Sequence, residues 1–199
     1  MGDLLIAPRA FFERLKASKP TLFAPWLVAV LASLLASLAN VVATRFLPSL
    51  SFGSPLVFAV LGGIIFGLLA WGIYGLVLRL LAGAESRAWE VAGWASLPGV
   101  VVGLVLLPLA ALFPVSGNLA APPGLTDAEA LREWTAQYTA LVRGATFSRV
   151  AQGASVVGGI WSVGLTYVAL RVLVPQRALI GTLGVAVISL GFIVWGLTR

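Results

Sequence analysis

The sequence predicts an all-α integral membrane protein with five transmembrane helices, and three observations favour this fold class. Of the 199 residues, 60% are hydrophobic and only 10% are charged, whereas a soluble domain has about 25% charged residues. The mean hydropathy is +1.03. A spanning helix takes about 20 apolar residues, and five runs are long enough: 23–46, 56–81, 91–113, 150–174 and 178–197. We therefore expect residues 1–199 to form a single membrane domain.

The composition also narrows the chemistry. The chain has no Cys and no His, which excludes disulfides, thiol nucleophiles and imidazole bases. We expect neither a metal ion nor another cofactor. Thirteen Lys and Arg against seven Asp and Glu give a net charge of +6. In a membrane protein such an excess usually flanks the spans, and a nucleic-acid partner is not expected because a basic groove needs polar surface that this chain lacks.

Residues 1–20 form a basic leader before the first span. Pro8 suits the first position of a helix, where its missing N–H costs nothing. From there one helical face is apolar and the other is charged; the apolar residues are Phe11, Phe12 and Leu15, and the charged ones are Arg9, Glu13 and Lys16. This pattern predicts a short helix lying in the membrane interface. A frayed basic leader is the other interpretation.

A second amphipathic helix is predicted at 126–143, in the connection before the fourth span. Thr126 and Glu129 fit a capping box, in which both side chains accept from exposed backbone N–H groups. The residues that follow repeat at spacings of three and four and form one apolar face: Leu131, Trp134, Tyr138 and Leu141. We expect this helix outside the hydrocarbon core. Alternatively, it merges with the fourth span and Gly144 acts as a hinge.

The distribution of Lys and Arg predicts the orientation of the chain. With five spans, eight of these residues fall on the side of the N-terminus and five on the other side. Because basic loops stay inside, we expect a cytoplasmic N-terminus and a C-terminus outside the cell.

Ionisable residues are absent from the middle of every predicted span. This argues against a proton-coupled carrier, a voltage sensor and intramembrane hydrolysis by paired carboxylates. The best candidates for a polar cluster lie on the inner side around the second connection: Arg79, Glu85, Arg87 and Glu90. The other interpretation of these residues is a solvated turn with local ion pairs, which contribute little to stability.

Polar and small residues inside the spans form a second group of candidates. The first span carries Ser33, Ser37, Asn40 and Thr44 on one helical face, and the fourth carries Ser162 and Thr166. Such residues either hydrogen-bond to neighbouring helices or line a hydrated path. The third span contains Pro98, two residues after Ser96, and Pro108. Each proline removes a backbone hydrogen bond. We therefore expect this helix to be kinked or broken, which is common in ordinary bundles and also occurs at transporter binding sites.

Several segments are similar to those of a known family. The run Gly93-Trp94-Ala95-Ser96-Leu97-Pro98 resembles the Gly-Tyr-Ser-x-x-Pro-like segment in the third span of the Yip family, five-span proteins named for their interaction with Ypt/Rab GTPases. Residues 4–15 resemble the leader of the prokaryotic members, Trp161-Ser162 begins a similar fourth-span stretch, and 171–179 resembles its following turn.

The resemblance implies a cytosolic N-terminus, an outer or lumenal C-terminus and a non-enzymatic role. The long N-terminal region of the eukaryotic members and their Asp-Leu-Tyr-Gly-Pro-like segment are missing, so GTPase binding is not transferred to this chain. Trp94-Ala95 also replaces the usual Tyr-Ser pair, which removes any role that rests on that hydroxyl.

Two functional hypotheses result. The first is a non-enzymatic structural, interaction or lipid-associated scaffold in a prokaryotic plasma membrane, with membrane lipids, a protein partner or a second copy of the chain as its partners. The alternative is a transporter or channel for a small neutral solute, lined by the polar face of the first span and the Pro98 break. An enzyme would have to rely on Glu85 or Glu90.

Overall fold

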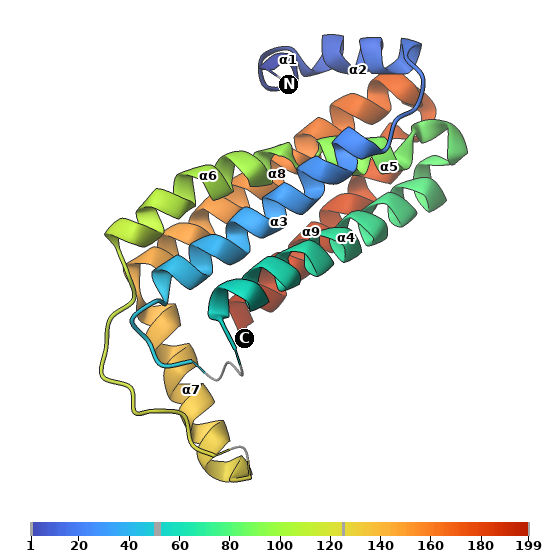
Figure 1. Cartoon of the computed structure of the whole chain (residues 1–199). Coiled ribbons are helices and arrows are strands. Elements are labelled where there is room, and N and C mark those ends of the chain that lie inside the picture. The colour runs from blue at the N-terminus through green and yellow to red at the C-terminus, as the bar shows by residue number, and fades with distance from the viewer. Residues whose placement is uncertain (1, 50–52, 125, 199) are drawn as a thin grey trace.

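The computed structural model describes residues 2–49, 53–124 and 126–198. These residues form a bundle of long helices, with α1 and α2 across one end and α7 at the other (Figure 1). In chain order the elements are α1 (Gly2–Ile6), α2 (Pro8–Ala17), α3 (Phe23–Ala43), α4 (Pro55–Ala82), η1 (Ala84–Ser86), α5 (Ala88–Trp94), α6 (Leu97–Leu112), α7 (Ala128–Gly144), α8 (Thr146–Leu173), η2 (Pro175–Arg177) and α9 (Ala178–Thr198).

The predicted all-helical membrane class is confirmed. Among the described residues, four segments are long and apolar enough to cross a bilayer: Phe23–Ala43, Pro55–Ala82, Ala84–Leu112 and Thr146–Leu173. The predicted fifth span coincides with α9, a helix of 21 residues, and the full count of five stays a prediction. The first predicted span corresponds to α3, which ends at Ala43 instead of 46. The third predicted span is divided into α5 and α6.

Close contact between helix backbones holds α3 against α4. Gly63 and Gly67 of α4 face α3, where a β-carbon on Gly63 would lie 2.9 Å from the Cα of Leu34 and one on Gly67 would lie 3.0 Å from the Cα of Val30. Any larger residue would push the two helices apart. The small residues of the second span therefore permit the tight packing that membrane helices use in place of a hydrophobic driving force.

Where burial is described, the core consists of two clusters. One lies where α1 and α2 cross the end of the bundle (Figure 1), and it includes Leu4, Phe12, Leu78, Val91 and Leu170. The other lies toward α7 and includes Ala43, Leu106, Ala110, Val115 and Phe147. Leu4 and Phe12 are both fully buried. The N-terminal segment is thus a pair of helices packed on the bundle, and α1 is an element that the sequence did not indicate.

The helix before the fourth span is separate from it, because Ala145 adopts an extended conformation between α7 and α8. Helices α7 and α8 are thus only one residue apart, next to the hinge that the merged alternative places at Gly144. The N-cap also differs by one residue from the predicted one. Asp127, not Thr126, caps α7, and its carboxylate accepts a 3.0 Å hydrogen bond from the N–H of Ala130.

Substitution of Asp127 tests its role as the N-cap of α7. Asp127→Ala should lower the stability of α7 by about 1 kcal/mol because the Ala130 N–H loses its partner. Thr126→Ala should have almost no effect. Hydrogen exchange of the α7 amides in a detergent micelle measures both changes, and equal protection in the two variants would contradict the assignment of the cap.

Candidate functional site

The third span is broken at the predicted place. Helix α5 ends at Trp94, and α6 begins at Leu97, with Pro98 in its first turn. Around the break the Ser96 N–H donates to the Gly93 carbonyl, and the Ser96 hydroxyl donates to the Ala92 carbonyl at 3.0 Å. The serine side chain thus satisfies a carbonyl that the interrupted helix leaves free. At Pro108, by contrast, α6 continues without interruption.

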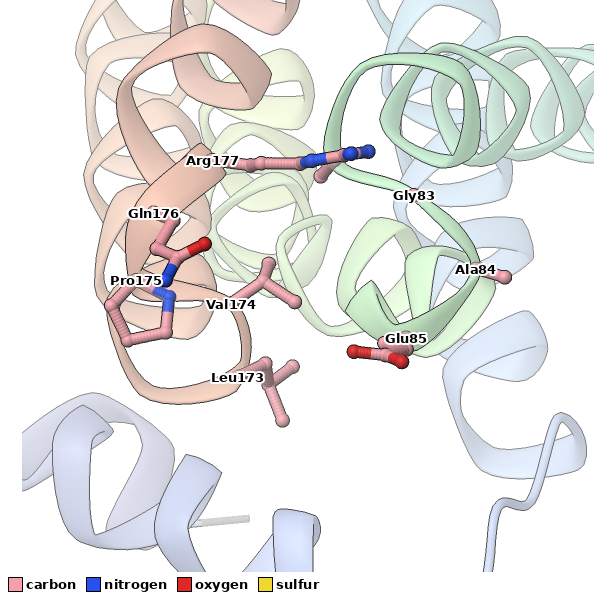
Figure 2. Close-up of a pocket in the computed structure, with 9 residues that line it drawn as sticks. Gly83, Ala84, Glu85, Leu173, Val174, Pro175, Gln176 and Arg177 are labelled. Atoms are coloured by element: carbon pink, nitrogen blue, oxygen red, sulfur yellow. The ribbon is translucent and has the colours of Figure 1, made fainter.

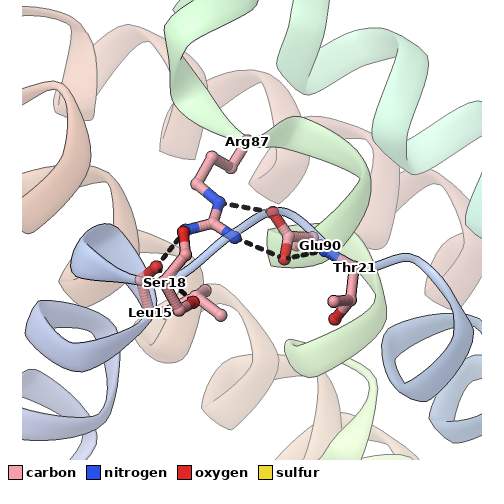
Figure 3. Close-up of polar contacts among 5 residues, drawn as sticks. All are labelled: Leu15, Ser18, Thr21, Arg87 and Glu90. Carbon is pink, nitrogen blue, oxygen red and sulfur yellow. Dashed lines mark hydrogen bonds and ion pairs between the residues drawn. The ribbon is translucent and has the colours of Figure 1, made fainter.

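A buried ion pair lies just before this break. The Arg87 guanidinium donates through Nε and Nη2 to the two carboxylate oxygens of Glu90, with 2.7 Å between Nη2 and Oε1 (Figure 3). The exposed fraction is only 12% for the Arg87 side chain and 2% for that of Glu90. Two parallel donor–acceptor contacts are the strongest geometry available to an arginine and a carboxylate.

The same pair holds the N-terminal segment. Arg87 Nη1 donates to the carbonyl of Leu15 and, at 3.2 Å, to that of Ser18, where α2 ends. The backbone N–H of Thr21 donates to Glu90 Oε1 at 3.1 Å. Figure 3 shows these five residues converging from the α2 end, the linker to α3 and α5. We call this group of five the Arg87 cluster; it fastens α2 to the third span.

Backbone conformation and packing support the Arg87 cluster. Arg87 has φ +50°, a left-handed conformation that is uncommon for residues other than glycine and that persists where surrounding contacts hold it. Phe11 of α2 packs edge-on against Trp94, with ring centroids 5.1 Å apart. Trp94 belongs to the segment that resembles the family motif, so the leader and this motif are in direct contact.

The four charged residues predicted around the second connection separate in the structure. Arg87 and Glu90 come together in the interior, instead of lying in a solvated turn, whereas Arg79 and Glu85 are exposed. Sequence reasoning missed Leu15, Ser18 and Thr21. Only their backbone groups contact Arg87 and Glu90, and the Ser18 hydroxyl donates to the Leu15 carbonyl at 2.8 Å. No side-chain pattern in the sequence marks such backbone contacts.

Two depressions lie beside the end of α8 at this end of the bundle. The first, of about 640 Å³, lies between the α4–α5 and α8–α9 connections, where Arg177 reaches toward Gly83 and Glu85 lies nearby (Figure 2). The second, of about 720 Å³, lies between α2 and α8 and is lined by both; we call it the α2–α8 groove. It is lined by Arg9, Glu13, Lys16, Tyr167, Val168, Arg171, Val172 and Pro175.

The polar face of the first span divides between two environments. Ser33 and Ser37 face the glycines of α4, at the close contact between the two helices. Asn40 is exposed, and the Thr44 hydroxyl donates to the Asn40 carbonyl within the same helix. The structure therefore does not bring all four residues to one shared space.

In the fourth span Thr166 is fully buried and joins two helices. Its hydroxyl lies 2.8 Å from the Tyr74 hydroxyl of α4 and 2.8 Å from the carbonyl oxygen of Ser162. We expect Thr166→Val to destabilise the bundle by about 1 kcal/mol, because the Tyr74 hydroxyl loses its partner. The measurement is the midpoint of unfolding in detergent. Adding Tyr74→Phe to this variant should cost little more, and full additivity would contradict the pairing.

No cluster of residues suited to a metal ion occurs among 2–49, 53–124 and 126–198. The features of this end of the molecule are one buried ion pair, two depressions and several exposed cations. Such an arrangement can hold a segment in place and attract anionic groups.

The architecture is that of a polytopic helical membrane protein whose N-terminal helices are fastened across one end of its bundle. The model of one family, the Yip1 domain, matches residues 2–198. The chain therefore belongs to the Yip1 family, and the resemblance noted in the sequence is confirmed over nearly its whole length. Comparison with curated proteins and with solved structures gave no match.

Proposed function

We propose that this member of the Yip1 family is a non-enzymatic scaffold of a prokaryotic plasma membrane. In this role the bundle holds α1 and α2 at the cytoplasmic surface, where they meet membrane lipids and a protein partner or second copy. The observation that carries the proposal is the Arg87 cluster, which ties α2 to the third span through a buried ion pair.

Burying the Arg87–Glu90 pair costs free energy. Removing two charges from water is expensive, and well-packed apolar side chains often give equal or greater stability. What a buried pair contributes instead is a specific arrangement, in this case one position for α2 relative to α5. A scaffold needs such a fixed surface, whereas a helix that only floats on lipid does not.

The orientation and the absence of catalysis are parts of the same proposal. Arg9, Arg14 and Lys16 lie on α2, and basic residues favour the cytoplasmic side. Both carboxylate oxygens of Glu90 accept hydrogen bonds from Arg87. This engagement supports a structural role for the most buried carboxylate of the described chain rather than one in acid–base chemistry.

The packing of α3 favours the scaffold over the solute path. Ser33 and Ser37 lie at a contact where the α3 backbone leaves no space for a β-carbon on the facing glycines of α4. The Ser96 hydroxyl donates a hydrogen bond to the Ala92 carbonyl. These residues would have to face water in order to line a path.

Glycerol flux across proteoliposomes tests the proposal. Vesicles that contain the full chain should swell at the rate of protein-free vesicles in stopped-flow light scattering. The matched variant is Asn40→Ala, which removes the exposed amide of the first span. Faster swelling with the native sequence, abolished by Asn40→Ala, would replace the scaffold with the transporter.

A further inference from the structure

The α2–α8 groove has an excess of cationic groups with free donors. Arg9 Nε donates to Glu13 at 2.9 Å, and Lys16 Nζ donates to the Val172 carbonyl at 3.1 Å. A guanidinium has five N–H donors and an ammonium has three, so both side chains keep donors for another acceptor. In the part of the chain that the structure describes, Arg171 has no ion-pair or hydrogen-bond partner.

One wall of the groove continues into an apolar face of α8. Val157, Ile160, Gly164, Tyr167 and Arg171 follow one another at spacings of three and four, so they share one side of the helix. Val157 and Ile160 are 64% and 68% exposed, and Tyr167 is 38% exposed. An exposed, largely apolar stripe therefore leads directly to an unpaired arginine at the end of the helix.

Gly164 makes a notch in this stripe. Nothing lies within 4 Å of the position where its β-carbon would be. From Val157 to Arg171 the stripe is about 21 Å long at 1.5 Å per residue, which exceeds the roughly 15 Å thickness of one hydrocarbon leaflet. An acyl chain can thus lie along the stripe with its headgroup at Arg171.

We propose that the α2–α8 groove binds one anionic glycerophospholipid, with its phosphodiester at Arg171, Lys16 and Arg9 and one acyl chain along α8 past Gly164. Charge complementarity selects this occupant. The groove carries three cations and one carboxylate, and a phospholipid of net negative charge neutralises it better than a zwitterionic one. The inference names a partner for the proposed scaffold and relies on that function only for the placement of α2 at the membrane surface.

Native mass spectrometry of the full chain in detergent, titrated with phosphatidylglycerol or with phosphatidylcholine of the same chains, tests the proposal. We expect tighter binding of phosphatidylglycerol. Arg171→Gln should weaken its binding about fivefold, which corresponds to the roughly 1 kcal/mol assigned to one cation at an anionic surface. The matched control is Arg79→Gln, since Arg79 is also exposed but lies at the end of α4, outside the groove.

A second variant tests whether an acyl chain lies along α8. Gly164→Leu should weaken phosphatidylglycerol binding because the leucine side chain fills the notch, where no protein atom lies within 4 Å of the β-carbon position, and it leaves every cation in place. Equal losses in Arg171→Gln and Arg79→Gln would overturn the site, because only the total charge would then matter. Equal affinity for the two lipids, or unchanged affinity in Gly164→Leu, would also overturn it. The glycerol flux of the same preparations is independent of these outcomes, so failure of the lipid site and failure of the scaffold are distinguishable.

Discussion

Arg87→Ala should destabilise the protein by about 3–5 kcal/mol, because it leaves the Glu90 carboxylate buried without its charged partner. It also removes the donors to the carbonyls of Leu15 and Ser18, so α2 should detach from the bundle before the rest unfolds. The free energy of unfolding in mixed micelles measures the first effect. Limited proteolysis between α2 and α3 measures the second.

Two controls isolate the buried pair. Arg9→Ala removes an exposed ion pair with Glu13, for which we expect a change of less than about 1 kcal/mol. Replacing both members, as Arg87→Met with Glu90→Met, removes the buried charges together and should cost clearly less than Arg87→Ala alone. If Arg87→Ala costs no more than Arg9→Ala, the Arg87 cluster does not fasten α2.

Gly93→Ala should destabilise the protein by about 3 kcal/mol, near the upper end for an overpacked site. A β-carbon on Gly93 would overlap the carbonyl group of Pro25, at the start of α3. Backbone atoms cannot rotate away, so α5 and α3 would have to separate. Thermal unfolding in detergent measures this effect.

The matched control for this substitution is Gly164→Ala, which also lies within a helix. Its β-carbon would meet nothing within 4 Å, and alanine is about 1 kcal/mol better than glycine inside a helix. We therefore expect Gly164→Ala to be neutral or slightly stabilising. Similar losses in the two variants would mean that the contact with Pro25 is not as close as the structure has it.

The helices of this protein are largely predictable because each apolar run is long enough to form one span. The break at Pro98 is also predictable, since proline cannot donate the hydrogen bond that the third span needs there. The cap of α7 is harder, because Thr126 and Asp127 are adjacent and both are good N-cap residues.

The sequence singles out Arg87 and Glu90 as candidates for a polar cluster, but their burial and their contacts with the N-terminal segment could not be predicted. Arg87 and Glu90 are three residues apart in a polar connection, a pattern typical of exposed ion pairs. Their burial depends on the contact with the Leu15 carbonyl, and Leu15 is 72 residues from Arg87 in the sequence. The α2–α8 groove presents the same difficulty, because α2 and α8 meet only in the folded chain.

The most direct test of the central claim, that the Arg87 cluster fixes α2 on the bundle, is a distance measured between α2 and the α8–α9 connection in lipid nanodiscs. The chain has no native cysteine, so spin labels can be placed at Ala17→Cys and Gln176→Cys, both of which are exposed positions. We predict one narrow distance distribution that Arg9→Ala leaves unchanged and Arg87→Ala broadens. A broad distribution with Arg87 in place, or one that Arg87→Ala does not alter, would contradict the claim.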